Sequence, residues 1–247
     1  MTISPEFGTA GAAVTAAVLA YLAVADPLIG RRMYAALQRR RPTDPRALTR
    51  YYTVVTAAWW LLAAVAAAGF LLAEDVSAAD VGLTAPETPW YAALLCALLI
   101  TGAVVTGRTM RRLHAEDRNV PGMSTIEAML PRTAAERRYA TAAAVTDGIC
   151  AEFVYRGLFI AFGVGVLGLH LYLAAALALV VYALAGLYQG RRGVIAFALF
   201  GAIGTLFYLT TGSLLVPVVF HVAMTVRDLA FIPVPPRTQQ TDAAAAL

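Results

Sequence analysis

The sequence predicts an all-α membrane protein, a polytopic bundle of about seven transmembrane helices. Of its 247 residues, 60% are hydrophobic and only 14% are charged, whereas a typical soluble domain carries roughly 25% charged residues. The mean hydropathy is positive, at +0.69. Long apolar segments alternate with short polar connections, which is the pattern of a chain that crosses a bilayer repeatedly.

About seven of the apolar segments have the length of a membrane span, with an uncertainty of a few residues at each boundary. They are Thr9–Ile29, Thr53–Ala73, Trp90–Gly107, Tyr139–Gly165, Leu171–Tyr188, Val194–Leu209 and Leu214–Phe231. The first follows a lead without basic residues and runs directly into arginines, so we expect a retained helix and not a cleaved signal peptide.

The connections between these segments alternate in charge. Those at residues 31–50, 108–138 and 189–193 are rich in arginine, whereas residues 74–89 hold four acidic residues and no basic one. Short basic loops stay in the cytoplasm. We therefore expect an integral protein of the cytoplasmic membrane, with the N-terminus outside and the C-terminus inside.

The chain divides into three expected regions. Residues 1–138 form N-terminal transmembrane helices with cytoplasmic loops, residues 139–233 form a helical core, and residues 234–247 form a disordered tail. Every basic residue is arginine, and alanine is abundant, which hints at a GC-rich genome and a bacterial source. Ser124 and Glu127 have the S-x-x-E spacing of a capping box, which predicts a short cytoplasmic surface helix or a solvated connector.

Charged side chains fall inside the fourth apolar segment, in the stretch DGICAEFVYRG. A charge at this depth costs roughly 2.5 to 3.5 kcal/mol on insertion scales, so it marks a site or a pair. Glu152 and Arg156 are four residues apart and share a helix face, which predicts an intrahelical ion pair. Asp147 has no local partner, so we expect it to face a wet cavity or a base on another helix.

The last apolar segment carries a second group of polar residues. His221 and Thr225 share one helix face, and Asp228 continues it. A single histidine among apolar neighbours is more often a hydrogen-bonded structural residue than a catalytic one. Arg227 and Asp228 lie close enough to the segment's end to reach the interface.

Four stretches of the second half occur in a characteristic order: LPRTAAERR, AEFVYRG, YALAGLYQGRRG and YLTTGSLLVPVVFHVAMT. In this order and spacing the chain resembles the CPBP intramembrane endopeptidases, which include CAAX prenyl-protein processing enzymes and bacteriocin-processing or self-immunity proteins. The resemblance implies a CPBP-like core over residues 139–233. The first family motif reads Glu-Glu-x-x-x-Arg; here Ala151 replaces the leading glutamate, while Glu152 and Arg156 are kept.

The second and third motifs also depart from the family pattern. Phe-x-x-x-His becomes Tyr182 to Gly186, so the histidine is missing. His-x-x-x-Asn or Asp begins correctly with His221, but Thr225 stands at its last position. The resemblance implies that the first glutamate and the second-motif histidine activate a water, while the third motif stabilises the oxyanion.

These departures predict a degenerate homologue, a pseudoenzyme that binds a peptide, a lipid or a membrane partner. A general base contributes about 10² to 10⁴ in rate, and Ala151 and Gly186 remove the base and its partner. An engineered exchange would explain Ala151 alone, whereas natural divergence explains all three changes. The remnant motif residues Glu152, Arg156 and His221 are the candidate catalytic residues.

Two alternatives stay open. In the first, the protein is an active membrane enzyme, a peptidase or a catalyst of other acid/base chemistry on an apolar substrate, that uses Asp147, Glu152 and His221. Asp147 is one turn, about 5.4 Å, from Ala151, so it can substitute for the glutamate only through a shifted substrate or a bound water. In the second, a transporter or channel uses Asp147 as an ion carrier, although no inverted repeat supports this.

We expect no metal, no cofactor and no nucleic-acid partner. Zinc needs three or four nitrogen, sulfur or carboxylate ligands. His114 lies in a loop, and His170 and His221 lie in different spans at different depths. The expected partners are membrane lipid and a membrane or prenylated peptide, and the oligomeric state is left open.

Overall fold

The computed structural model describes residues 2–116 and 123–230, and within them the regular structure is helical apart from one isolated bridge between Glu6 and Asp75. The predicted all-helical membrane bundle is confirmed. The expected tail at 234–247 lies outside the described residues, as does the C-terminal end of the last predicted span.

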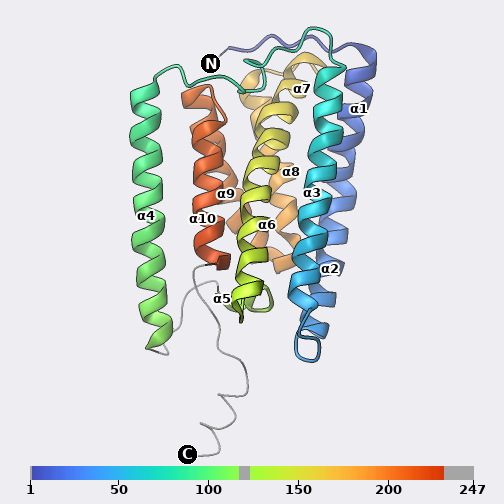
Figure 1. Ribbon diagram of the computed structural model, residues 1–247. Coiled ribbons are helices and arrows are strands. Elements are labelled where there is room, and N and C mark those ends of the chain that lie inside the picture. The colour runs from blue at the N-terminus through green and yellow to red at the C-terminus, as the bar shows by residue number, and fades with distance from the viewer. Residues whose placement is uncertain (1, 117–122, 231–247) are drawn as a thin grey trace, which may run out of the picture.

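The long helices run roughly along one common direction (Figure 1). The α-helices are α1 (Thr9–Ala20), α2 (Asp26–Arg40), α3 (Ala47–Leu71), α4 (Pro89–Ala115), α5 (Met123–Ile126), α6 (Ala134–Glu152), α7 (Phe159–Gly165), α8 (Leu171–Ala185), α9 (Gly190–Thr211) and α10 (Leu215–Ala230). Two π-helical segments, η1 (Tyr21–Ala25) and η3 (Phe153–Leu158), and two 3₁₀ segments, η2 (Glu127–Met129) and η4 (Gly186–Gln189), interrupt or join them.

Five helical segments of the described residues are long and apolar enough to cross a membrane. They are Thr9–Arg40, Ala47–Leu71, Pro89–Ala115, Ala134–Gly165 and Leu171–Thr211. The last holds both α8 and α9, which pack against each other and are joined at Gly190. The φ of Gly190 is +74°, a value at which a side chain is strained, so glycine permits the turn.

Helix α6 and its continuation form the centre of the bundle. In the most apolar stretch of Ala134–Gly165, 78% of the residues are buried, against 11% for α3 and 17% for α4. α6 packs against α3 on one side and α10 on the other, and α4 lies at the edge, where it packs against α10 (Figure 1). Most residues of α6 and its continuation are therefore shielded from lipid, whereas most residues of α4 are not.

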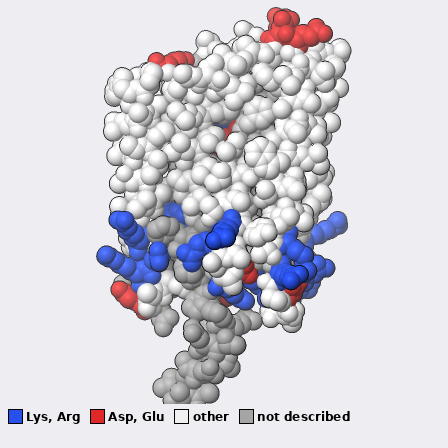
Figure 2. Space-filling model, in the orientation of Figure 1, with Lys and Arg blue, Asp and Glu red and all other residues white. Residues whose placement is uncertain are grey.

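Charge is concentrated at the two ends of the bundle. Figure 2 shows arginines gathered around one end, acidic residues at the opposite end, and an almost uncharged wall between them. This distribution fits a protein that spans the hydrophobic core with its polar ends in water. The direction in which it crosses the membrane stays a prediction.

The structure corrects the predicted capping box. Helix α5 begins at Met123, so Ser124 lies inside the first turn and not at its start. The pattern occurs instead at Thr133, whose hydroxyl accepts a hydrogen bond of 3.2 Å from the backbone N–H of Glu136. The prediction failed because Ser124 is followed by only one short helical turn, whereas Thr133 precedes the long central helix α6.

Candidate functional site

A cavity of about 210 Å³ lies inside the bundle, between α2 and α3 on one side and α6, α8 and α10 on the other. Its lining is mostly apolar and aromatic, and it includes three predicted residues, Asp147, Ala151 and Thr225. Tyr21 and Ile29 line it and are also 36% and 39% exposed. The cavity is therefore bordered, beside the first helix, by residues that are themselves partly exposed at the apolar side of the bundle.

The predicted ion pair between Glu152 and Arg156 is present, with 3.0 Å between Oε1 and Nη1. The same Glu152 oxygen lies 2.7 Å from Nδ1 of His221, on α10. Arg156 Nη2 also donates to the backbone carbonyl of Gly201, on α9, at 3.0 Å. The three remnant motif residues thus form one cluster, and Glu152, Arg156 and His221 are each at most 3% exposed.

Asp147 meets the other side of the same histidine. Its Oδ2 lies 3.3 Å from Nε2 of His221, and its side chain is 32% exposed. A carboxylate such as Glu152 can only accept, so the facing Nδ1 must donate. Nε2 of a neutral ring then has no hydrogen, so a hydrogen bond between it and Asp147 needs a proton on the ring nitrogen or on the carboxyl group. The structure thus places Asp147 on the cavity and beside a base on another helix, whereas the expected water in the cavity stays a prediction.

Two glycines let these groups approach one another. A Cβ at Gly148 would lie 2.5 Å from Cγ2 of Val222, so only glycine allows α6 and α10 to pack this closely. That contact places His221, the neighbour of Val222, beside Asp147. A Cβ at Gly204 would lie 3.2 Å from Nη2 of Arg156, so the glycine leaves room for the guanidinium group.

The second-motif positions line or border the cavity without supplying a base. Tyr182 lies beneath the guanidinium of Arg156, with 4.3 Å from its ring centroid to Cζ, and it packs edge-on against His221. Gly186 touches the neighbouring helix so closely that a Cβ would lie 2.6 Å from the carbonyl oxygen of Gly193. A histidine does not fit at Gly186 in this backbone.

Two further polar residues of the cavity were not among the predicted site residues. Asp26 comes from the N-terminal half and lies where the π-helical η1 passes into α2. Tyr155 lies within the π-helical η3, is 1% exposed, and its hydroxyl has no hydrogen-bond partner among the described residues. One sign of Asp26 was present in the sequence, because an acid followed by proline is unusual within a predicted span. π-Helical turns often mark functional sites.

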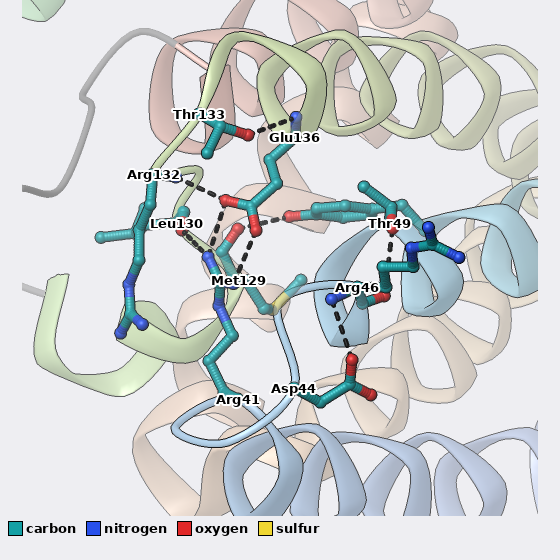
Figure 3. Close-up of polar contacts among 10 residues, drawn as sticks. Arg41, Asp44, Arg46, Thr49, Met129, Leu130, Arg132, Thr133 and Glu136 are labelled. Carbon is teal, nitrogen blue, oxygen red and sulfur yellow. Dashed lines mark hydrogen bonds and ion pairs between the residues drawn. The ribbon is translucent and has the colours of Figure 1, made fainter. Parts of the chain in front are cut away.

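One end of the cavity is closed by residues 123–133, here called the floor segment. Its Met129 lines the cavity, and the Met129 carbonyl accepts a 2.8 Å hydrogen bond from Tyr52. Arg41 holds the segment to α6 by contacting both oxygens of Glu136, at 2.6 and 2.8 Å, and the carbonyl of Leu130 at 3.2 Å (Figure 3). This segment is a clamped part of the bundle and not a solvated connector.

The described residues contain no group of three or more histidine, cysteine, aspartate or glutamate side chains that could hold a metal ion. His170 lies at the start of α8, where its ring contacts Tyr172, and His114 lies near the end of α4. Neither joins the cluster around His221.

Comparison with known proteins identifies the region that carries this site. Residues 136–226 match the family model described as Type II CAAX prenyl endopeptidase Rce1-like. No curated protein and no solved structure matches the chain. The matched region begins at Glu136, which binds Arg41, and runs through the Glu152 motif to Val226, just past Thr225. The chain is therefore an integral membrane protein whose residues 136–226 are similar to the Rce1-like type II CAAX prenyl endopeptidases.

Proposed function

We propose that the protein is an intramembrane peptidase in which Asp147 and His221 form the acid/base pair. The observation that carries this proposal is the 3.3 Å contact between the Asp147 carboxylate and Nε2 of His221, on the cavity that Ala151 also lines. A side chain on a helix leans toward the N-terminus. A glutamate at position 151 would lean toward the level of Asp147, so Asp147 supplies a carboxylate close to the vacated place.

The groups around this pair fit the proposed roles. Asp147 takes a proton from a water in the cavity while the water oxygen attacks the scissile carbonyl. The proton then passes to the leaving nitrogen as the C–N bond breaks. His221 shares the proton of Asp147 and is fixed by Glu152, which is itself held by Arg156. The Thr225 hydroxyl, which lines the cavity, can donate to the developing oxyanion.

The proposed substrate is a peptide embedded in or attached to the membrane, such as a prenylated peptide. The cavity is bordered by Tyr21 and Ile29, which are partly exposed at the apolar side of the bundle, whereas the floor segment closes the arginine-bearing end. We therefore expect an apolar chain to enter laterally from lipid. Membrane lipid is the expected surrounding partner.

The test is cleavage of membrane and prenylated peptides by the purified protein in nanodiscs, followed by mass spectrometry. We expect Asp147→Asn to lower the rate by about 10² to 10⁴, the usual contribution of a general base, and His221→Ala to lower it at least as far. Asp75→Asn, at an exposed position at the acidic end, is the matched control and should keep the rate. Cleavage that survives Asp147→Asn would overturn the proposal.

Moving the carboxylate sharpens this test. In the double variant Asp147→Ala with Ala151→Glu, the acid returns to the position of the family motif without a second acid beside it. We expect it to recover part of the rate that Asp147→Ala alone removes.

A degenerate, binding-only protein is the second candidate, and Gly186 favours it because the backbone there excludes the second-motif histidine. Peptide binding without cleavage of any peptide by the wild-type protein would support this candidate and reject the proposed peptidase.

A further inference from the structure

The cavity is lined by an acid and by aromatic residues that have no role in the proposed acid/base chemistry. Apart from tyrosines, its described lining residues include only two ionisable side chains, Asp26 and Asp147. The bases of the neighbouring cluster, Arg156 and His221, are not among the lining residues. The cavity wall is thus negative on balance.

The two acids differ in whether a basic side chain lies beside the carboxyl group. Asp147 has His221 beside it. Asp26 makes no hydrogen bond or ion pair with any other described residue, and it lines the same cavity as Asp147. An acid at membrane depth without a partner inside the protein usually serves a ligand or an ion.

Tyr155 gives an independent indication of a ligand. It lines the same cavity, it is buried to 99%, and its hydroxyl has no partner among the described residues. Leaving a buried hydroxyl unpaired costs about 1 to 3 kcal/mol. A bound peptide carbonyl would accept from this hydroxyl while a neighbouring cationic group reached Asp26.

We propose that Asp26 selects the substrate, which carries a positively charged side chain next to the peptide bond that Asp147 addresses. The aromatic lining supports this choice, because faces of tryptophan and tyrosine rings attract cations; Tyr21, Tyr51, Trp59 and Tyr155 all line the cavity. The inference rests on the proposed peptidase function and adds its substrate class.

The proposed peptidase function points to a peptide as the source of the charge. Asp26 lies five residues before Arg31 within one continuous helical segment, Thr9–Arg40, so it is about 7.5 Å from the first arginine of the basic end. The long side chain of a lysine in a spanning peptide can reach this level. Such a lysine would exchange the cost of an unpaired charge in lipid for a pair with Asp26.

The experiment compares two apolar spanning peptides that differ at one central residue, lysine in one and norleucine in the other. Norleucine keeps the hydrocarbon chain and removes the charge. Binding is measured by anisotropy of labelled peptide on the His221→Ala variant in nanodiscs, so that hydrolysis does not interfere. We expect the lysine peptide to bind roughly tenfold tighter or more, since hydrogen bonds to charged groups contribute about 1.5 to 3 kcal/mol.

Asp26→Asn, added to the same background, keeps the shape of the side chain and removes its charge. It should abolish the preference for lysine and leave the affinity for the norleucine peptide unchanged. Asp75→Asn is the matched control and should keep the preference. Equal binding of the two peptides, or a preference that survives Asp26→Asn, would overturn the inference.

The two proposals can fail separately. If the wild-type protein cleaves neither peptide but binds the lysine peptide more tightly, the peptidase function fails and Asp26 remains a recognition residue. If it cleaves both peptides equally and binds them equally, the peptidase function stands and the role of Asp26 is rejected.

Discussion

Two buried ion clusters of this bundle differ in how completely their polar atoms are paired. In the floor cluster, Arg41 contacts both oxygens of Glu136, and the backbone N–H of Arg132 adds a 2.6 Å hydrogen bond to the same carboxylate. In the cavity cluster, Oε2 of Glu152 has no partner among the described residues, and neither has the neighbouring Tyr155 hydroxyl. In the first cluster both carboxylate oxygens are paired, although Nε of Arg41 has no partner among the described residues. The second leaves a carboxylate oxygen unpaired, and the unpaired Tyr155 hydroxyl beside it lines the cavity.

This difference separates a structural role from a functional one. Buried polar groups are normally paired, so an unpaired one needs an explanation such as catalysis or a bound ligand. The floor cluster joins α2, α6 and the floor segment, and it does not touch the cavity directly. The cavity cluster borders the cavity through Asp147. Stability should therefore depend on the first cluster and activity on the second.

The largest effect on stability is expected from Arg41→Met. The change leaves the buried Glu136 carboxylate without its cation, and breaking a buried pair from one side costs about 3 to 5 kcal/mol. The free energy of unfolding in mixed micelles measures the effect. The double variant Arg41→Met with Glu136→Leu should cost much less, because no charge is left unpaired. An Arg41→Met protein of unchanged stability that has lost activity would reverse the assignment of roles.

A smaller loss is expected from Gly148→Ala. The added methyl meets Val222 and pushes α10 away from α6, and overpacking of this kind costs about 1 to 3 kcal/mol. The contact between Asp147 and His221 should lengthen, so the cleavage rate should fall further than the lost stability explains. Gly102→Ala on α4, where a Cβ meets nothing within 4 Å, is the matched control. Equal behaviour of the two variants would show that the close helix contact is not needed.

The smallest expected changes in stability have opposite signs near the two clusters. Tyr155→Phe removes an unpaired buried hydroxyl, so it should stabilise the ligand-free protein by about 1 kcal/mol. Tyr52→Phe removes a hydroxyl that donates 2.8 Å to the Met129 carbonyl, so it should destabilise the protein by a similar amount. Thermal unfolding of both variants in detergent tests this. A destabilised Tyr155→Phe protein would mean that the hydroxyl already has a partner in the free protein.

Local spacing was enough to predict part of the site. The pair between Glu152 and Arg156 followed from their four-residue separation, and the exposure of Asp147 to a cavity followed from its lack of a local partner. The pairing of Asp147 with His221 did not follow, because it depends on the close approach of α6 and α10 at Gly148. The structure places a carboxylate beside His221, and this contact is the reason why we propose the active alternative and not the pseudoenzyme.

Other contacts of the site were not predicted from the sequence. Some join residues that are far apart along the chain, and others lie near π-helical turns. Asp26 and Asp147 are far apart in sequence, as are Arg41 and Glu136, and periodicity within one helix says nothing about such contacts. The π-helical η1 and η3 insert wider turns near Asp26 and Tyr155. A count of 3.6 residues per turn therefore becomes less accurate for residues beyond these turns.

The sequence alone was enough to show that this chain crosses a membrane as helices, because its apolar segments are too long and too uncharged for a soluble core. It also marked Asp147, Glu152 and His221 as polar residues at membrane depth, since they stand out against apolar neighbours. Which polar residues share a cavity, and which lie paired away from it, became known only from the folded structure. Those contacts join helices from different parts of the chain, and glycine contacts and π-helical turns set their geometry.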